Sequence, residues 1–387
     1  MTEKESTPAD ILWGNAVFLF LTPPLAIAGV IWWFTSMPFT WAPLIAAFVL
    51  FMVTGVVITA GYHRLFSHRT YKATAPVRLA FAIVGAASWQ NSVIEWSAHH
   101  RRHHRFVDTD KDPYNALRGF WYSHILWICH KGQYHGNLNN VKDLFRDPIA
   151  AWQHKYYWPL SIAINVLVPL SLGLWTGDIA SMLLWAGLVR VVIGHHTTFF
   201  INSWAHIHGS QPYSDQNTSR DSALVALFTH GEGFHNYHHA FETDYRNGRA
   251  WYHWDPGKWL INILAWLGLA SDLRRIPDDM LLRRRFEENH SRFAELLESL
   301  GETIEDWGEA ISQERHLAHA ATRIETALTD LRAKRSAWQT AIKENRSRHH
   351  IRSLHRTMRR TQRSIKASLN EWELMLRQYT LQMATAV

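Results

Sequence analysis

The chain has 387 residues, of which 47% are hydrophobic, with 20 Trp and a single Cys. One cysteine excludes an intramolecular disulfide, and no nucleic-acid-binding motif accompanies the formal net charge of +7, so we expect no nucleic-acid partner. Basic residues that flank long apolar stretches more often face the anionic headgroups of a membrane.

Four apolar stretches are long enough to cross the hydrocarbon core of a bilayer, which takes about 20 helical residues. Only short links separate the first stretch from the second and the third from the fourth, so we expect two transmembrane hairpins. Buried helices of a large soluble protein are the alternative, but the near absence of charge within the stretches favours the membrane. The expected spans cover residues 11–34, 41–60, 158–175 and 179–204.

The distribution of Lys and Arg predicts the orientation of these spans. The two hairpin links lack Lys and Arg, whereas the segments that follow each hairpin are rich in both. The positive-inside rule therefore places these segments and both termini in the cytoplasm. Residues 1–10 show no signal-peptide pattern. Arg190, inside the fourth span, is expected to face the helix bundle or to reach toward the cytoplasm.

Histidines gather in three clusters on the segments that follow the hairpins. The second and third clusters share the spacing i, i+3, i+4, which puts three imidazoles on one face of a helix. Histidines scattered over a wet surface are the alternative, but the repetition of one spacing favours a metal site, and eight imidazoles exceed what one ion takes. We therefore expect two metal ions. The clusters are His63 and His68; His100, His103 and His104; and His235, His238 and His239.

The chemistry of such a site follows from its surroundings. Imidazole suits Zn, Cu, Fe and Ni, so the ligand type alone leaves the metal open. A site at the cytoplasmic ends of membrane spans is expected to act on a lipid. Hydrolysis needs only one Lewis-acidic ion, whereas two redox metals beside an alkyl chain favour O₂-dependent attack on an unactivated C–H bond.

Further motifs surround the clusters: Thr59 to His68, Glu95-Trp96, His100 to His104, Asp112-Pro113, Arg118 to Phe120, Asn202 to His206, and Gly231 to His239. With these motifs, the chain from about Val56 to Ile276 resembles membrane fatty-acid desaturases of the stearoyl-CoA (Δ9) acyl-CoA desaturase type.

The resemblance implies a site with two iron ions, an acyl tunnel and a water molecule held on one iron by Asn202. It implies that Gln90, Trp96 and Thr198 shape the bend of the tunnel, and that Asn91 lies near the thioester. Ala47 and Phe51, one helical turn apart in the second span, match the depth at which side-chain bulk closes the tunnel. The implied direct ligands are His63, His68, His100, His103, His104, His206, His235, His238 and His239.

The implied activity is the O₂-dependent introduction of a cis double bond, at Δ9, into a long-chain fatty acyl-CoA by two hydrogen abstractions at the di-iron centre. The chain has no His-Pro-Gly-Gly haem loop. Electrons would therefore come from a separate protein such as a ferredoxin, a cytochrome b5 or a reductase. The family commonly has Arg-Asp where this chain has Ala98-His99. The resemblance therefore leaves open whether the acyl chain of the substrate is attached to CoA, to a lipid or to a carrier protein. The alternatives are an acyl-lipid desaturase, a membrane di-iron hydroxylase or oxidase, and a non-catalytic metal-binding membrane protein.

Residues 277–387 differ in character from the desaturase-like residues 1–276. Apolar residues recur at helical spacing among many charges, and the run from Arg346 to Arg363 is strongly basic. This pattern predicts a helical hairpin or short coiled coil with breaks near Gly301 and Gly308, suited to self-association or to docking on lipid or a partner. The expected fold is all-α: four transmembrane helices in two hairpins, a cytoplasmic helical cap with the histidines, and a C-terminal helical extension.

Overall fold

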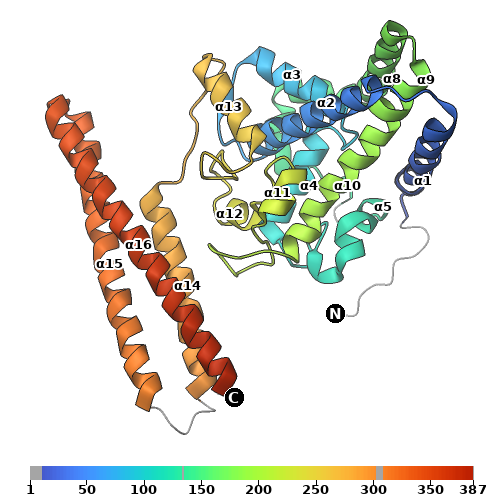
Figure 1. The fold of residues 1–387 in the computed structure, drawn as a ribbon. Coiled ribbons are helices and arrows are strands. Elements are labelled where there is room, and N and C mark those ends of the chain that lie inside the picture. The colour runs from blue at the N-terminus through green and yellow to red at the C-terminus, as the bar shows by residue number, and fades with distance from the viewer. Residues whose placement is uncertain (1–10, 133–134, 302–307, 387) are drawn as a thin grey trace. The chain divides into compact units, whose positions relative to one another are not determined.

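The computed structural model describes residues 11–132, 135–301 and 308–386, so the expectation for residues 1–10 lies outside the described residues. The chain divides into two compact units. The first comprises Met1–Gln211 with Gln216–Arg275, and the second comprises Pro212–Asp215 with Ile276–Val387. Almost all regular structure in the described residues is helical (Figure 1), which confirms the predicted all-α class.

Four helices of the first unit are long and apolar enough to cross a membrane, as the sequence predicts. They are α1 (Trp13–Ser36); Ala42–Ser67, which joins α2 (Ala42–Val57) to the π-helix Ile58–Ser67; α8 (Tyr157–Thr176); and Ile179–His206. The last contains α9 (Ile179–Met182), the π-helix Leu183–Val189, α10 (Arg190–Asn202) and the 3₁₀ turn Trp204–His206.

The helix α1 illustrates how these elements pack. Its buried residues Leu19, Ala26 and Trp33 recur every seven positions, which is one narrow stripe of a helix. The indole nitrogen of Trp33 donates to the Ser181 hydroxyl at 2.8 Å. Most other apolar side chains of α1 are exposed, as expected for a helix that faces lipid rather than water.

The π-helix that continues α2 has a direct consequence for the histidines. The backbone N–H of His68 donates to the carbonyl of His63 at 3.0 Å, an i→i+5 bond. In an α-helix, residues five apart would be rotated by about 140°. The π-helical winding instead brings the two imidazoles together, with ring centroids 4.8 Å apart.

The remaining helices of the first unit are short, and most of them contribute buried residues to one core. The helix that carries the second cluster begins at a capping box: the Ser92 hydroxyl accepts from the Glu95 N–H, and the Glu95 carboxylate accepts from the Ser92 N–H. A two-stranded antiparallel ribbon, β1 (Lys72–Ala73) with β2 (Ala270–Ser271), pairs Lys72 with Ser271. The helices are α3 (Ala75–Ala86), α4 (Val93–Phe106), α5 (Trp127–Cys129), α6 (Lys142–Phe145), α7 (Pro148–Lys155), α11 (Ala223–Phe228), α12 (His235–Ala240) and α13 (Pro256–Trp266).

The second unit contains α14 (Asp278–Gly301), α15 (Gly308–Lys343) and α16 (Arg348–Ala386). Helices α15 and α16 lie side by side (Figure 1). A break between them, where Asn345 has a φ of 50°, is not foreseen by the sequence pattern. Their shared core includes Leu282 and Phe286 of α14, Ile324, Leu328 and Leu331 of α15, and Ile365, Leu369 and Trp372 of α16.

Candidate metal centre

The structure brings all nine predicted ligand histidines together, in two groups. Within each group, every histidine offers one ring nitrogen that lies within 4.8 Å of the nitrogens offered by the others. The first group draws on Ala42–Ser67 and the residue after it, on α4 and on α12; the second draws on α4, the end of Ile179–His206 and α12. The first group is His63, His68, His100, His104 and His238; the second is His103, His206, His235 and His239.

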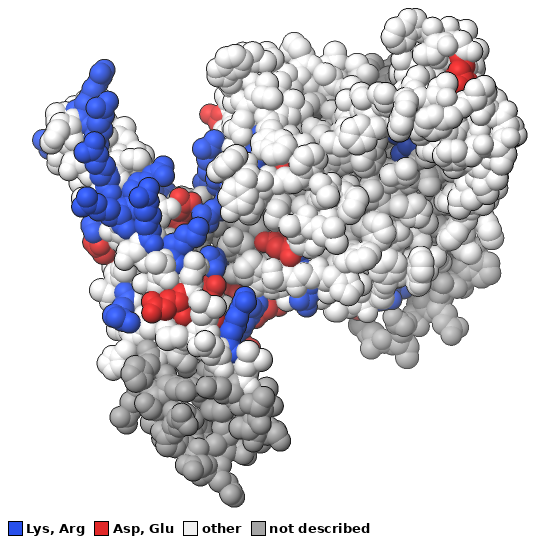
Figure 2. All heavy atoms as spheres, in the orientation of Figure 1, with Lys and Arg blue, Asp and Glu red and all other residues white. Residues whose placement is uncertain are grey.

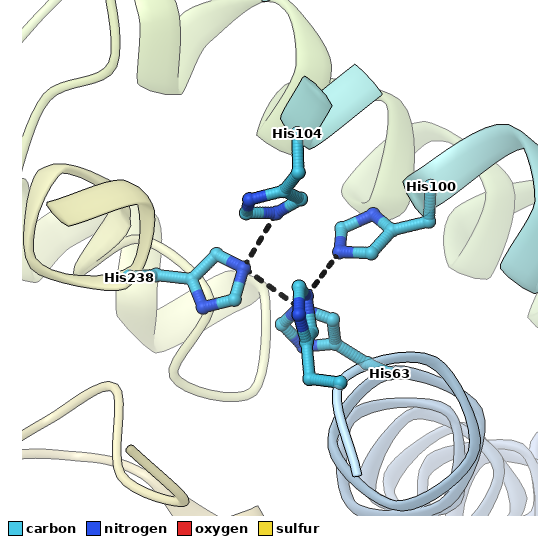
Figure 3. A group of neighbouring side chains, drawn as sticks. His63, His100, His104 and His238 are labelled. Carbon is cyan, nitrogen blue, oxygen red and sulfur yellow. Dashed lines mark hydrogen bonds between the residues drawn. The ribbon is translucent and has the colours of Figure 1, made fainter. Parts of the chain in front are cut away.

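The two helical clusters interleave between the groups. From α4, His100 and His104 join the first group while His103 joins the second. From α12, His238 joins the first group while His235 and His239 join the second. One helix face therefore supplies ligands to both groups, and Figure 3 shows His63, His100, His104 and His238 turned toward a common point.

Two of the four histidines in the second group have an outward ring nitrogen beside a polar partner. The Nδ1 of His103 lies 2.9 Å from the Asp112 carboxylate. The Nδ1 of His206 lies 2.8 Å from the Thr218 hydroxyl, which itself donates to Asp108 at 2.8 Å. Both rings are thus Nδ1–H donors, so in the neutral form their Nε2 atoms carry lone pairs.

These lone pairs fit a cation. The Nε2 atoms of the second group form a chain of contacts: His103 to His239 at 3.2 Å, His239 to His235 at 3.1 Å, and His235 to His206 at 3.1 Å. His103 and His206, at the two ends of this series of contacts, lack a proton at Nε2. The two middle rings would then have to supply three donated protons with only two Nε2 atoms, so no placement of protons satisfies all three contacts. A metal ion that accepts the four lone pairs removes this conflict.

The first group shows the same conflict. His63 Nδ1 lies 3.0 Å from the Glu232 carboxylate, and His104 Nδ1 lies 3.3 Å from Glu242. The Nε2 of His238 lies 2.9 Å from the Nε2 of both rings, yet it carries at most one proton (Figure 3). The donor set of this group therefore also fits a metal ion, here with five imidazoles.

Burial keeps five of these histidines neutral, which is the form that binds a metal. Burial lowers the pKa of His104 to about 4 and the pKa values of His100, His235, His238 and His239 well below the usual value.

A buried ion network surrounds His63. Arg64 bridges the carboxylates of Glu232, at 3.1 Å, and Asp255, at 2.8 Å. Burial by itself would raise the pKa of Glu232, but His63 and Arg64 lower it below its usual value, so the carboxylate stays charged. Sequence spacing does not reveal this network, although Glu232 lies in the Gly231 to His239 motif.

A cavity of about 760 Å³ reaches the histidines. Its lining includes the charged residues Asp110, Lys111 and Arg118, and the apolar residues Phe18 of α1 and Phe51 of α2. His63, His100, His103 and His235 lie on its wall. A lining of both kinds suits an amphipathic molecule, with a polar head and a hydrocarbon tail.

The residues predicted to bend the tunnel are joined across this cavity. Gln90 donates to the Thr198 hydroxyl at 2.9 Å and accepts from the Trp96 indole at 3.3 Å. The Trp96 ring stacks on His100 with centroids 4.8 Å apart. Asn91 and Asn202 also line the cavity, and the Asn91 N–H donates to the Tyr157 hydroxyl at 3.0 Å.

The two chain-length candidates differ in position. Phe51 lines the cavity, whereas Ala47 is buried and is not among the described residues on its wall. Arg190 faces the bundle, since its guanidinium donates to the Ala87 carbonyl at 2.8 Å and to Asn165.

Sequence reasoning missed His230, which also lines the cavity. The residue is 5% exposed, has a left-handed φ of 54°, and its buried Nε2 has no partner among the described residues. Its ring packs against Phe51, with centroids 4.7 Å apart, and against Gly55 of α2. Its position next to Gly231 and Glu232 is the only signal in the sequence.

Four long apolar helices, with nine histidines gathered near the ends of two of them, define a class of helical membrane proteins whose site can hold metal ions. The chain matches the family described as fatty acid desaturase over residues 39–261. It therefore belongs to the fatty acid desaturase family.

Similar proteins of known name agree with this family. The chain is 44% identical to a "Probable acyl-CoA desaturase" of Schizosaccharomyces pombe over 69% of its own length and 55% of that protein. It is 36% identical to "Stearoyl-CoA desaturase 5" of Bos taurus over 71% and 83%, and 36% identical to an "Acyl-CoA Delta(11) desaturase" of Spodoptera littoralis over 63% and 74%. The chain thus spans about half the length of its S. pombe relative.

Proposed function

We propose that this protein is an acyl-CoA desaturase, which introduces a cis double bond at Δ9 into a long acyl chain with two iron ions and O₂. The observation that carries the proposal is the position of four of the nine histidines on the wall of a cavity that both charged and apolar residues line. The names of similar proteins support an acyl-CoA substrate, and they include both stearoyl-CoA and Δ11 desaturases.

The two histidine groups would each hold one iron, and Asn202 would hold a water molecule that completes one coordination shell. Two such ions, with O₂ and two electrons from a separate protein, would supply the oxidising power that removes one hydrogen from each of two adjacent carbons, and the oxygen would leave as water. The carboxylates and hydroxyl behind the rings, from Asp112, Glu232, Glu242 and Thr218, fix the tautomer and direction of the ligands.

The chain's own residues would position the acyl chain. The bridge from Trp96 through Gln90 to Thr198 crosses the cavity beside His100, so it would bend the chain where the target bond must lie. The tail would enter the part of the cavity near Phe51 and His230, and the headgroup would stay at the end near Asp110, Lys111 and Arg118. The spans and the basic residues would place that end in the cytoplasm, where a separate electron-transfer protein would supply electrons.

The test is to express the chain in cells that lack this activity and to analyse their acyl chains by gas chromatography and mass spectrometry. A desaturase gives a product that has lost two hydrogen atoms, with a Δ9 double bond located by chemical derivatisation. A product that has instead gained one oxygen atom would identify a hydroxylase. Unchanged acyl chains, despite a protein loaded with iron and supplied with electrons, would favour a non-catalytic metal-binding protein.

A further inference from the structure

The positive charge of the chain is concentrated in one segment. Residues 330–366 contain twelve Lys and Arg against two Asp and Glu, a net charge of +10, whereas the whole chain has +7, so all other residues together sum to −3. The segment forms the end of α15 and the first half of α16. Figure 2 shows Lys and Arg gathered at this end of the α15–α16 pair.

The arginines of α16 form a continuous exposed face. Arg352, Arg356, Arg359 and Arg363 are spaced by three or four residues, so they follow one another along one side of the helix. These four and Arg360 are all exposed, and the structure pairs none of them with a carboxylate among the described residues. His355 joins Arg356, Arg359, Arg360 and Arg363 in lining a shallow groove of about 350 Å³. We call these six residues the arginine face.

The apolar side of the same helix is already occupied. Ile365, Leu369 and Trp372 are buried against α14 and α15. An amphipathic helix that enters a membrane needs a free apolar side, whereas the apolar side chains of α16 nearest the arginines are already packed. The arginine face therefore offers charge without apolar surface, and a partner must bind it by electrostatics.

We propose that the arginine face docks on the anionic phospholipid headgroups of the membrane that holds the spans. Seven Arg and no Lys occur from Arg346 to Arg363, and the planar guanidinium matches a phosphate with two parallel hydrogen bonds. The four apolar helices keep the second unit tethered near a bilayer, which raises the effective concentration of headgroups. An anionic leaflet attracts basic segments within a Debye length. The proposal does not depend on the proposed reaction.

The experiment measures contact between α16 and lipid in the full-length protein. Ser353, exposed beside Arg352, is changed to Cys and carries a fluorescent donor. The single native thiol is removed by Cys129→Ser. The protein is reconstituted in vesicles of phosphatidylcholine alone, or of phosphatidylcholine with phosphatidylglycerol, each with an acceptor dye on a trace of headgroups. Energy transfer is recorded from about 0.1 M to about 1 M salt, over which the Debye length falls from ~10 Å to ~3 Å.

We expect more energy transfer in the vesicles that contain phosphatidylglycerol than in those of phosphatidylcholine alone. This excess transfer should disappear at high salt. The triple variant Arg356→Gln, Arg359→Gln, Arg360→Gln should lose the excess. The matched control Arg283→Gln, Arg323→Gln, Arg377→Gln removes three exposed charges of the same unit elsewhere and should keep it. Gln has a helix propensity similar to that of Arg, and circular dichroism verifies that both variants stay folded.

Two results would overturn the proposal. The first is equal transfer in both lipid mixtures at low salt, or an excess that survives in the arginine-face variant. The second is donor fluorescence that does not change with phosphatidylglycerol but changes, in neutral vesicles, when an acidic electron-transfer protein is added. That result would assign the arginine face to a protein partner.

Discussion

Gly55 and His230 occupy one space between them: a Cβ built on Gly55 would lie 2.2 Å from Cε1 of the His230 ring. The ring therefore fills the room that any side chain at position 55 would need. Because His230 also lines the cavity and contacts Phe51, this interlock connects the packing of α2 to the shape of the cavity beside Phe51.

The interlock predicts a non-additive pair of substitutions. Gly55→Ala should lower stability by about 1–3 kcal/mol through overpacking, and His230→Ala should lower it by leaving a cavity. In the double variant the new methyl group enters the space of the lost ring, so the loss should be smaller than the sum by about 0.5–3 kcal/mol. Thermal unfolding of the four proteins in detergent measures the difference, and additive losses would refute the interlock.

The same variants predict a change in product. His230→Ala enlarges the cavity beside Phe51, so we expect a shift of the product profile toward longer acyl chains. Gly55→Ala together with His230→Ala should restore part of the original profile. The chain lengths of the unsaturated products, measured by gas chromatography, test this. An unchanged profile would place the acyl tail away from His230.

Phe51 and Ala47 lie one helical turn apart, yet we expect their substitution to have different effects. Phe51 lines the cavity and Ala47 does not, so Phe51→Ala should favour longer chains. Ala47→Val should change stability more than chain length, because Ala47 is buried at 8% exposure in close packing. Product profiles and unfolding temperatures of both variants test whether position 51 controls chain length and position 47 controls stability. A profile that responds only to position 47 would contradict the observed cavity.

Removal of one imidazole predicts loss of metal and of activity. His235→Ala takes one donor from a group of four, so the iron content of the purified protein and its desaturation product should both fall to near background. His208→Ala is the control, because His208 is exposed and belongs to neither group. Elemental analysis must count zinc as well, since Zn²⁺ binds most such sites more tightly than Fe²⁺. Normal iron and normal product in His235→Ala would refute the ligand assignment.

Substitution of Glu232 and Glu242, whose carboxylates lie beside ligand histidines, should lower metal affinity and stability to different extents. Glu232→Gln weakens the support of His63 and leaves the buried Arg64 with Asp255 as its remaining carboxylate partner. We expect metal affinity to fall about 10–100-fold and stability to fall by up to about 3–5 kcal/mol. Glu242→Gln should cost much less stability, because the Glu242 side chain is 51% exposed. Metal titration and unfolding of both variants test the order, and equal losses would contradict it.

Local sequence determined the elements of this protein. The length of an apolar run is enough to predict a span, because bilayer thickness fixes how many residues a helix needs. The spacing of His100, His103 and His104 is enough to predict a shared helix face, because helical periodicity is a local property. The bias of Lys and Arg toward the histidine-bearing segments and the end of the chain is equally visible in the sequence.

Tertiary structure decided how these elements combine. The division of each helical cluster between two groups depends on how α4 and α12 approach one another, which no spacing encodes. The approach of His68 to His63 depends on π-helical winding that sequence periodicity does not predict. Glu232, Arg64 and Asp255 meet across long sequence separations, as do Gly55 and His230. Such contacts form only when distant segments pack, because burial and charge pairing at these positions depend on residues far away in the chain.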